Sequence, residues 1–478
     1  MHIEGYLKDI NFLTDANDPT VTYAEFTVPA IGATSYPYKA FVDIHDERLK
    51  AYIRKFVLPN IQEDEKITVS ELLQDAKDIL MLGGNPDRVA PRVRTAGKLN
   101  EGLVEYDLNN PNHEYIRVTQ DSWVVSKKHK HKFLKRNTLG CQITPVHTEK
   151  NLLTLIKPFV NTDRNSRILF SAWLVQSFCM GNHSAMLVQA PAGSGKSSLT
   201  KIARRIIDPS NLQANIMTGK KDDLFSALSN SYFVAFDNCS DELSKEVSDI
   251  LCAAITGSTM AKRKLYTTNE LGVYELHSSL ILNGLDVIPT FSDLASRCLL
   301  LKLKTIDESS RKTDEALSIA FENALPEILG AIFNTLSTAM SISTTLKPTR
   351  LPRMASAYLD MLSIAIAMGV SEAEFERIYF ENLNLIDKER ANIAIVEAVQ
   401  EYLNSDSVKG RAVSGKLSDL RQKIYANYSG KVSELPASPS LFGRKLRQEL
   451  KTFSAVGITV LLDNTFEDGT HLKLIKEK

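Results

Sequence analysis

Ala190-Pro-Ala-Gly-Ser-Gly-Lys-Ser197 is the most informative stretch of this chain. The apolar run Ala185–Gln189 precedes it, and a run with helical periodicity, residues 198–206, follows it. A glycine-rich turn between a buried strand and a helix surrounds an anion with backbone N–H groups and the positive end of the helix dipole. The stretch therefore predicts a phosphate-binding loop, in which Ala190 replaces the first glycine of the usual pattern.

The residues of this loop have separate expected roles. Gly193 and Gly195 let the backbone approach closely, Lys196 supplies a positive charge for the terminal phosphates, and the Ser197 hydroxyl is an expected Mg²⁺ ligand. ATP and Mg²⁺ are the expected cofactors. The expected nucleotide-binding residues are Ala190, Pro191, Ala192, Gly193, Ser194, Gly195, Lys196, Ser197 and Ser198.

The composition is that of an ordinary globular protein with several domains. The 478 residues include 57 Lys and Arg and 57 Asp and Glu, so the net charge is zero and any basic surface must be local. No apolar run approaches the roughly 20 residues that span a bilayer, and the N-terminus lacks the features of a signal peptide. We expect a cytoplasmic protein without a membrane partner. Reduced thiols, four of them in apolar or strand-like contexts, are expected at Cys141, Cys179, Cys239, Cys252 and Cys298.

Short apolar runs alternate with helical patterns between residues 149 and 306. Such runs are typical of parallel strands that are buried on both faces. The strands are expected at residues 185–189, 214–217, 232–236, 279–282 and 298–303. The fold class is therefore α/β, with a five-stranded parallel sheet around the phosphate loop.

The remaining segments predict four further units. Residues 1–84 read as a small α+β domain, and residues 85–148 as a β-rich accessory segment that forms a collar. Residues 307–388 read as a helical lid, broken at Pro326, Pro348 and Pro352. Residues 389–478 read as three helices followed by two strands, the pattern of a winged helix.

Polar residues end the strands that neighbour the phosphate loop. Asp237 ends the third strand, where it would hold the Mg²⁺. Asn238 follows where a water-activating carboxylate is usual, so the general base stays open, with Asp241 and Glu242 as alternatives. Asn283 ends the fourth strand, where AAA+ proteins place a γ-phosphate sensor.

Arg297 precedes the fifth strand. An arginine at this point can reach the nucleotide of a neighbouring subunit in a ring. A cation at the end of a helix is the alternative interpretation.

Residues 259–276 predict a hairpin whose turn contains Asn269 and Gly272. In a ring it would project into the central channel, where cations meet phosphates and a tyrosine stacks on bases. The expected DNA contacts of the hairpin are Lys262, Arg263, Lys264 and Tyr266, with Lys220 and Lys221 as weaker candidates. An exposed hairpin with solvated charges is the alternative. The basic run 127–132 is interpreted as a solvated face.

The C-terminal helix at residues 440–453 carries a second basic group. Arg444, Lys445 and Arg447 are expected to face the DNA major groove, while Leu441, Leu446 and Leu450 face a core. The turn 464–469 would be the wing. Winged helices also bind proteins, and that alternative stays open.

These motifs together resemble a known family, the AAA+ replication-initiator helicases of phages and integrative genomic islands. Among them are the self-loading, MCM-like proteins of staphylococcal pathogenicity islands and cassette chromosomes. The resemblance covers residue 88 to the C-terminus. It rests on A-P-A-G-S-G-K-S (190–197), F-D-N (236–238), R-K-L-Y-T (263–267), I-L-N-G (281–284), D-L-A-S-R (293–297), L-P-R-M (351–354) and S-P-S-L-F-G-R-K-L-R (438–447).

The resemblance implies a homo-hexameric ring that binds single-stranded and double-stranded DNA at a replication origin and unwinds it, with 3′-to-5′ movement. It implies that Arg353, in the helical lid, is a second nucleotide sensor; a cation at a helix start is the alternative. Three partners stay open for residues 1–84: DNA, a regulatory protein encoded by the phage or island, or only the neighbouring subunit.

Two other functions fit the same loop. An ATP-hydrolysing DNA-binding regulator or loader would share every phosphate-site residue but not unwind DNA. A non-replicative ATPase, such as a defence or signalling switch, would not bind DNA. A fused primase is disfavoured, because its only candidate acid pair, Asp43 and Asp46, fits a surface turn equally well.

Overall fold

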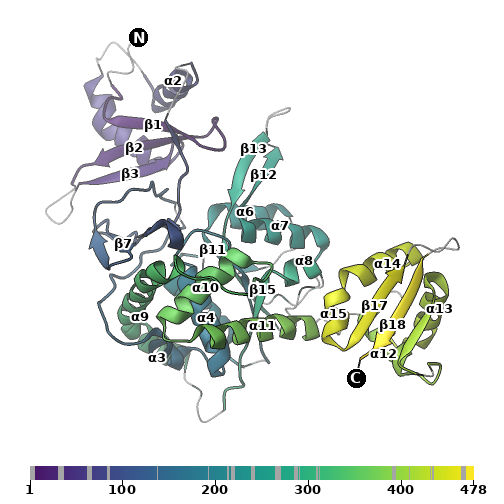
Figure 1. Ribbon diagram of the computed structural model, residues 1–478. Coiled ribbons are helices and arrows are strands. Elements are labelled where there is room, and N and C mark those ends of the chain that lie inside the picture. Colours follow the sequence, from purple (N-terminus) through teal and green to yellow (C-terminus); the bar gives the residue numbers. More distant parts are fainter. Residues whose placement is uncertain are drawn as a thin grey trace.

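A computed structural model gives the fold of the chain (Figure 1). It describes all residues except 1–5, 31–36, 62–66, 83–86, 137, 192, 213–214, 217–220, 238, 240–242, 264–270, 285–288, 290, 308–310, 312, 390–393, 409, 431, 433–434, 464–469 and 478. The predicted site residues Ala192, Lys220, Asn238, Lys264 and Tyr266 lie outside the described residues, as do Asp241 and Glu242.

The centre of the molecule is a parallel sheet covered by helices, as the sequence predicts. Four strands of five or six residues are joined by the two-residue strand β10. Numbered along the chain from 1 to 5, the strands lie in the order 5-1-4-3-2. The strands are β9 (Ala185–Gln189), β10 (Asn215–Ile216), β11 (Phe233–Asp237), β14 (Ser279–Gly284) and β15 (Cys298–Lys302).

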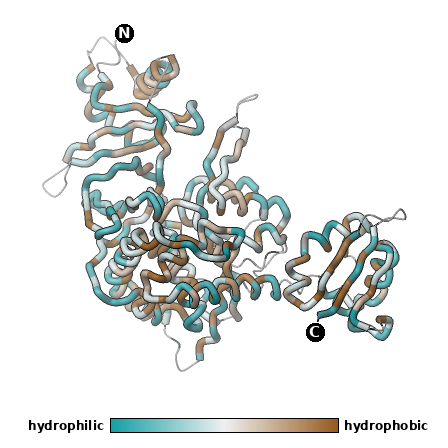
Figure 2. The backbone as a smooth tube through the Cα atoms, viewed as in Figure 1, coloured by the Kyte–Doolittle hydropathy of each residue, from teal (hydrophilic) through white to brown (hydrophobic). Residues whose placement is uncertain are grey.

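Alternation along the strands explains why their sequences are apolar throughout. Met186 and Val188 enter one hydrophobic cluster, whereas Ala185 and Leu187 enter another on the opposite face. Both faces of the sheet are therefore buried. The tube in Figure 2 shows the hydrophobic segments gathered within this central part. The helices around the sheet are α3 (Leu152–Ile156), α4 (Arg164–Gln176), α5 (Lys196–Ile207), α6 (Lys221–Asn230), α7 (Lys245–Thr256) and α8 (Ser292–Ala295).

The lid consists of α9 (Asp314–Ser343), α10 (Ala355–Ala367) and α11 (Glu372–Glu389). The predicted break at Pro326 is wrong, because α9 continues through it. A proline removes one helical hydrogen bond, but buried neighbours such as Leu325, Ile328 and Leu329 hold the helix in place. By length and composition alone α9 is apolar enough to cross a membrane, contrary to the sequence expectation. Its packing against α3, α4 and α10 makes it a core helix.

Asp360 of α10 is a half-buried titratable group beside this core. Burial raises its pKa to about 7, although a hydrogen bond with Gln176 opposes the shift. An acid whose pKa is higher in the folded state binds more protons folded than unfolded between pH 4 and 7. Stability therefore falls as the pH rises through that window.

We expect Asp360→Asn to remove this pH dependence and to raise the free energy of unfolding at pH 8 by about 1–3 kcal/mol. This range is the free energy that corresponds to the pKa shift, reduced because the side chain is partly exposed to solvent. Thermal melting from pH 4 to 8 measures it. Asp121→Asn, in an exposed turn, is the matched control and should leave the profile unchanged. A parallel profile for Asp360→Asn would contradict the assignment.

The N-terminal unit is a four-stranded sheet of order β3-β2-β1-β4, packed against helices. The strand β4 lies after residue 84 and pairs in parallel with β1. The sheet therefore includes the first residues of the predicted accessory segment. The elements are β1 (Ile10–Asp15), β2 (Thr22–Val28), β3 (Tyr38–Asp43), α1 (Glu47–Tyr52) with short π and 3-10 turns at Ile53–Val57 and Leu58–Asn60, α2 (Val69–Leu82) and β4 (Arg88–Val89).

The accessory segment is an antiparallel meander of order β5-β6-β7-β8 that lies between the N-terminal sheet and the lid. It packs on α9 through β7 and β8. Trp123 donates a hydrogen bond to Asn334 of α9 at 2.7 Å. Its strands are β5 (Thr95–Ala96), β6 (Leu103–Asp107), β7 (Tyr115–Thr119) and β8 (Trp123–Ser126), with a 3-10 turn at Leu99–Glu101. A further 3-10 turn, Lys157–Phe159, lies outside this segment and follows α3.

The C-terminal unit has its own core and lies beyond α11 in Figure 1. It contains a strand that the sequence analysis missed, β16, which pairs with β18 to give the order β16-β18-β17. The predicted helix at 440–453 divides at Glu449, whose side chain is buried. The elements are α12 (Ala394–Asn404), β16 (Ala412–Lys416), α13 (Leu417–Asn427), α14 (Pro439–Gln448), α15 (Leu450–Ala455), β17 (Ile458–Asp463) and β18 (His471–Lys476).

Candidate functional site

The glycine-rich loop joins β9 to α5 at the carboxyl edge of the parallel sheet. Gly193 and Gly195 have φ angles of 75° and 83°, in the left-handed region that favours glycine. A Cβ atom at Gly193 would lie 3.5 Å from the guanidinium of Arg311. The Lys196 ammonium donates a hydrogen bond to the Ala190 carbonyl at 2.7 Å, so its side chain folds back over the loop.

The same loop contains a buried polar group that fits an anionic ligand. The Ser194 hydroxyl is buried and makes no hydrogen bond within the described residues. A buried hydroxyl without a partner is costly unless a ligand supplies one. Pro191 and Ser198 flank the loop at its entry and on the first turn of α5.

Ser197 and Asp237 lie together, as the magnesium hypothesis requires. The Ser197 hydroxyl donates to the Asp237 carboxylate at 3.2 Å, across 40 residues of sequence. Asp237 is the last residue of β11, which is separated from β9 by β14 alone. A hydroxyl and a carboxylate are oxygen ligands of the kind Mg²⁺ prefers, beside the loop that would hold the phosphates.

Asn283 lies between these two groups, on β14, but it is fully buried. Its side-chain amide donates to the Thr200 hydroxyl at 2.7 Å, and that hydroxyl donates to the Lys196 carbonyl at 3.0 Å. Asn283 therefore fixes the first turn of α5 in this structure. A role as a phosphate sensor needs its amide to change partner, and it stays a prediction.

Arg297 and Arg353, predicted to act separately, share one carboxylate. Arg297 pairs with Asp293 at 2.5 Å and also donates to the Cys252 sulfur at 3.6 Å. Arg353 pairs with the other oxygen of Asp293 and donates to the Ser296 hydroxyl at 2.9 Å. Burial would raise the pKa of Asp293, but hydrogen bonds from the two arginines lower it to about 2. The lid and the end of α8 thus meet in one ion cluster.

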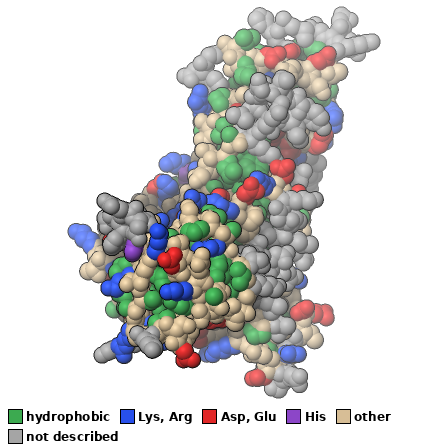
Figure 3. Space-filling model, turned by 90° about the vertical axis from the view of Figure 1, so that its right-hand side faces the viewer, with side chains coloured by type: hydrophobic (Ala, Val, Ile, Leu, Met, Phe, Trp, Pro, Cys, Tyr) green, Lys and Arg blue, Asp and Glu red, His purple; other side chains and the backbone are tan. Residues whose placement is uncertain are grey.

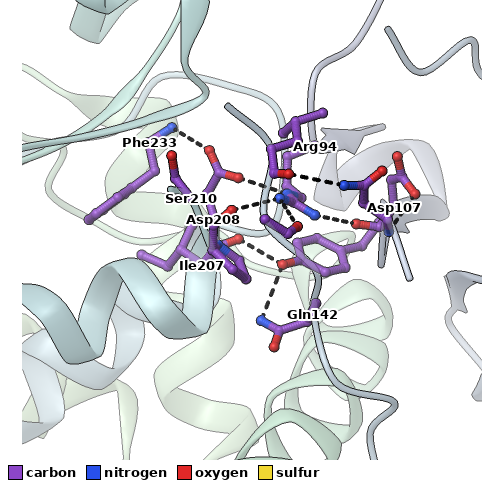
Figure 4. Close-up of polar contacts among 12 residues, drawn as sticks. Arg94, Asp107, Gln142, Ile207, Asp208, Ser210 and Phe233 are labelled. Atoms are coloured by element: carbon purple, nitrogen blue, oxygen red, sulfur yellow. Dashed lines mark hydrogen bonds and ion pairs between the residues drawn. The ribbon is translucent and has the colours of Figure 1, made fainter. Parts of the chain in front are cut away.

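Arg94 ties the accessory segment to the far ends of the two elements that carry the site (Figure 4). Its fully buried guanidinium pairs with Asp208, which follows α5, at 2.7 Å and also donates to three carbonyl oxygens. The other Asp208 oxygen accepts from the Phe233 amide at the start of β11. The junction therefore fixes α5 and β11, whose opposite ends carry Ser197 and Asp237.

We expect Arg94→Met to lower the free energy of unfolding by about 3–5 kcal/mol, because it leaves the Asp208 carboxylate buried without its cation. Denaturant or thermal melts measure the loss. Arg92→Met is the matched control, since its pair with Glu275 is at 3.5 Å and partly exposed, and it should cost under about 1 kcal/mol. Equal losses for the two variants would contradict the role of Arg94.

The predicted hairpin is present as β12 (Ser258–Arg263) and β13 (Leu271–Leu276), which pair only with each other in the described part of the chain. Gly272 lies in β13, opposite Lys262, and not in the turn as predicted. The hairpin projects from the central part in Figure 1. In the middle of β13 the Val273 amide donates to Asp18 of the N-terminal unit at 3.3 Å. Lys262 and Arg263 lie on β12, and Lys221 begins α6, where it pairs with Glu246.

The C-terminal basic residues lie on α14 with different environments. Arg444 and Arg447 are exposed, whereas Lys445 pairs with the buried Glu449 at 3.2 Å. The prediction that Leu441 and Leu450 face a core is wrong, because they are 45% and 43% exposed. The helix divides at Glu449, so Phe442 and Phe453 join Leu446 in the core instead. Figure 3 shows Lys and Arg side chains spread over this side of the molecule and not in one patch.

Three residues near the site were given no role in the sequence analysis. Thr200 holds Asn283, Asp293 joins the two arginines, and Arg311 lies beside Gly193. Asp293 lies within the D-L-A-S-R motif, where its spacing of four from Arg297 is a detectable signal. Arg311 belongs to the connection between β15 and α9 and has no motif. The cysteine prediction is confirmed: Cys179, Cys239, Cys252 and Cys298 are buried and unpaired, and Cys141 is exposed.

The parallel sheet with polar residues at its carboxyl edge places the chain among mixed α/β proteins. Residues 150–384, slightly under half of the chain, match a family described as the actinomycete integrative conjugative element replication protein. The chain is therefore similar to a replication protein of a mobile genetic element. The narrower resemblance to staphylococcal islands stays a prediction.

Solved structures of the NrS-1 C-terminal region are also similar to the chain. Three of them, all apo, align over 100% of this chain and 100%, 99% and 99% of theirs, at 13%, 11% and 12% identity. Their TM-scores are 0.43, 0.42 and 0.42, which is too low to transfer a function. A search of curated proteins found no match.

Proposed function

We propose that the chain is an ATP-dependent DNA helicase that initiates replication of a mobile genetic element. The observation that carries the proposal is the contact of Ser197 with Asp237 at 3.2 Å, beside a loop held open by two glycines with positive φ. A hydroxyl and an ammonium group on the first turn of α5, with a carboxylate at the end of β11, form a set suited to Mg²⁺ and a triphosphate.

In this proposal each residue has one task. The loop amides and Lys196 hold the phosphates, while Ser197 and Asp237 hold Mg²⁺. ATP, when bound, supplies the phosphoryl group whose transfer to water releases the free energy for movement. Asn283 orients the first turn of α5 through Thr200. The water-activating residue stays open between Asn238, Asp241 and Glu242, which lie outside the described residues.

The order 5-1-4-3-2 of the sheet supports an AAA+ motor, the class that the motifs resemble. In that class the subunits form a ring, which we propose to be a hexamer with Arg297 facing the nucleotide of the next subunit. The hairpin β12–β13 then meets DNA through Lys262, Arg263, Lys264 and Tyr266. The C-terminal unit, with a basic helix and a three-stranded sheet, is proposed as an origin-binding winged helix.

A strand-displacement assay on forked DNA tests the proposal. We expect displacement that requires ATP and Mg²⁺ and is faster when the fork has a 3′ single-stranded arm, the polarity that the resemblance implies. ATP hydrolysis stimulated by DNA without displacement would favour the alternative, a DNA-binding regulator or loader. ATP hydrolysis without any DNA affinity would reject both.

A further inference from the structure

A cleft of about 690 Å³ lies between the N-terminal sheet and the accessory segment, away from the nucleotide site. Its walls come from β2 and β3, from β7 and the loop before it, and from the residues that follow β8. β3 and β7 lie side by side in Figure 1. Its lining contains four lysines and one carboxylate, Glu25, which pairs with Lys132. The lysines are Lys39, Lys127, Lys128 and Lys132.

Aromatic rings lie beside these cations. Tyr38 and His113 stack with their centroids 3.5 Å apart, and the buried Tyr115 supports His129 from beneath, with its centroid 4.2 Å away. His113 has a φ of 54°, an uncommon value for a residue other than glycine, and this backbone carries its ring against Tyr38. Lysines and aromatic rings along one concave surface are the combination that binds single-stranded nucleic acid.

The basic run 127–132, which lines the cleft, has its backbone held by a buried side chain, unlike a charge run that is solvated on all sides. The Glu105 side chain is fully buried and accepts hydrogen bonds from the amides of Lys130 and His131 at 2.9 and 3.0 Å. It also pairs with Arg117. Burial would raise the pKa of Glu105, but these amide hydrogen bonds lower it, so the anchor stays charged. The backbone of the run is thereby held in one conformation, which lowers the entropy cost of binding.

We propose that this cleft binds single-stranded DNA, through phosphate contacts from Lys39, Lys127 and Lys128 and base stacking at the Tyr38–His113 pair. Duplex DNA is the less suitable ligand, because its bases are already stacked and cannot reach the rings. The site is separate from the proposed hairpin contacts and needs no nucleotide. It would hold a strand beside the accessory segment while the motor acts on it.

Fluorescence anisotropy with labelled oligo-dT and a duplex of equal length tests the cleft, using the full chain without ATP from 50 to 200 mM salt. We expect the triple change Lys39→Ala, Lys127→Ala and Lys128→Ala to weaken oligo-dT binding at least about tenfold and to reduce the salt slope by about 2. Lys8→Ala, Lys347→Ala and Lys423→Ala, all exposed elsewhere, form the matched control and should bind like the wild type. Arginine at the three cleft positions should preserve binding.

Stacking has its own readout. Tyr38→Ala should weaken oligo-dT binding about fivefold or more with an unchanged salt slope, and Tyr38→Phe should not. Wild-type affinity in the cleft triple variant, or an equal loss on oligo-dT and duplex, would overturn the proposal. If the chain binds oligo-dT through the cleft but does not displace strands, the proposed helicase activity is wrong and the proposed binding site stands.

Discussion

Lys196→Ala is expected to lower the turnover of ATP hydrolysis by about 100- to 1000-fold, the usual cost of removing one group that stabilises charge in a transition state. In the structure the ammonium group rests 2.7 Å from the Ala190 carbonyl, within the loop that it would leave to meet a phosphate. Steady-state phosphate release with saturating DNA measures the loss. The fold should survive, because no core packing depends on this side chain.

Lys201→Ala is the matched control for this prediction. Lys201 lies on the same helix, α5, further from the loop, and its side chain is exposed. It carries the same charge, so a general electrostatic effect on ATP would appear in both variants. We expect normal turnover for Lys201→Ala. Retained turnover in Lys196→Ala would refute the nucleotide site itself.

The parallel sheet was predictable because its signal is local. A strand buried on both faces must be apolar, and residues 185–188 and 298–301 carry that pattern without interruption. The loop was equally readable as a turn between a strand and a helix, because it has glycines at the two positions with positive φ, Gly193 and Gly195. Asp237 could then be found as the polar residue that ends another strand of the same sheet.

The contacts that were missed depend on distant parts of the chain. Arg94 and Asp208 are 114 residues apart, and each looks like an ordinary surface charge until the fold buries the pair. β16 was missed because Ala412–Lys416 is polar and largely exposed, so pairing with β18 and not periodicity makes it a strand. The predicted helix break at Pro326 was wrong because the tertiary packing of α9 outweighs the low intrinsic helix propensity of proline.

The sharing of Asp293 by Arg297 and Arg353 is of the same kind. Sequence places the two arginines 56 residues apart in separate motifs, with roles in separate places. In the structure both arginines pair with one carboxylate, that of Asp293. A change at either arginine therefore alters the environment of the other.

Arg297→Ala is expected to leave nucleotide binding by separate subunits intact and to lower the ATP turnover of the assembled ring by about 1000-fold or more, the usual contribution of an arginine supplied to a transferring phosphoryl group. Arg297→Lys should not restore the turnover, because a guanidinium group makes several hydrogen bonds in a fixed plane and an ammonium group does not. Arg350→Ala is the matched control, since that arginine lies 3.8 Å from the Phe380 ring in the same region of the lid, and it should keep its turnover.

Mixing variants separates a role at the neighbour's site from a structural role. Arg297→Ala and Lys196→Ala subunits are each inactive alone, but in a mixed ring an intact Lys196 can face an intact Arg297. With equal amounts, about a quarter of the interfaces in a cyclic ring regain both groups, and turnover should return in proportion. If both variants assemble and bind nucleotide yet their mixture stays inactive, Arg297 serves its own subunit through the Asp293 cluster. Arg353→Ala subunits mixed with Lys196→Ala subunits give the same test for the second arginine. If turnover returns in this mixture too, the two arginines that share the Asp293 carboxylate act at one interface.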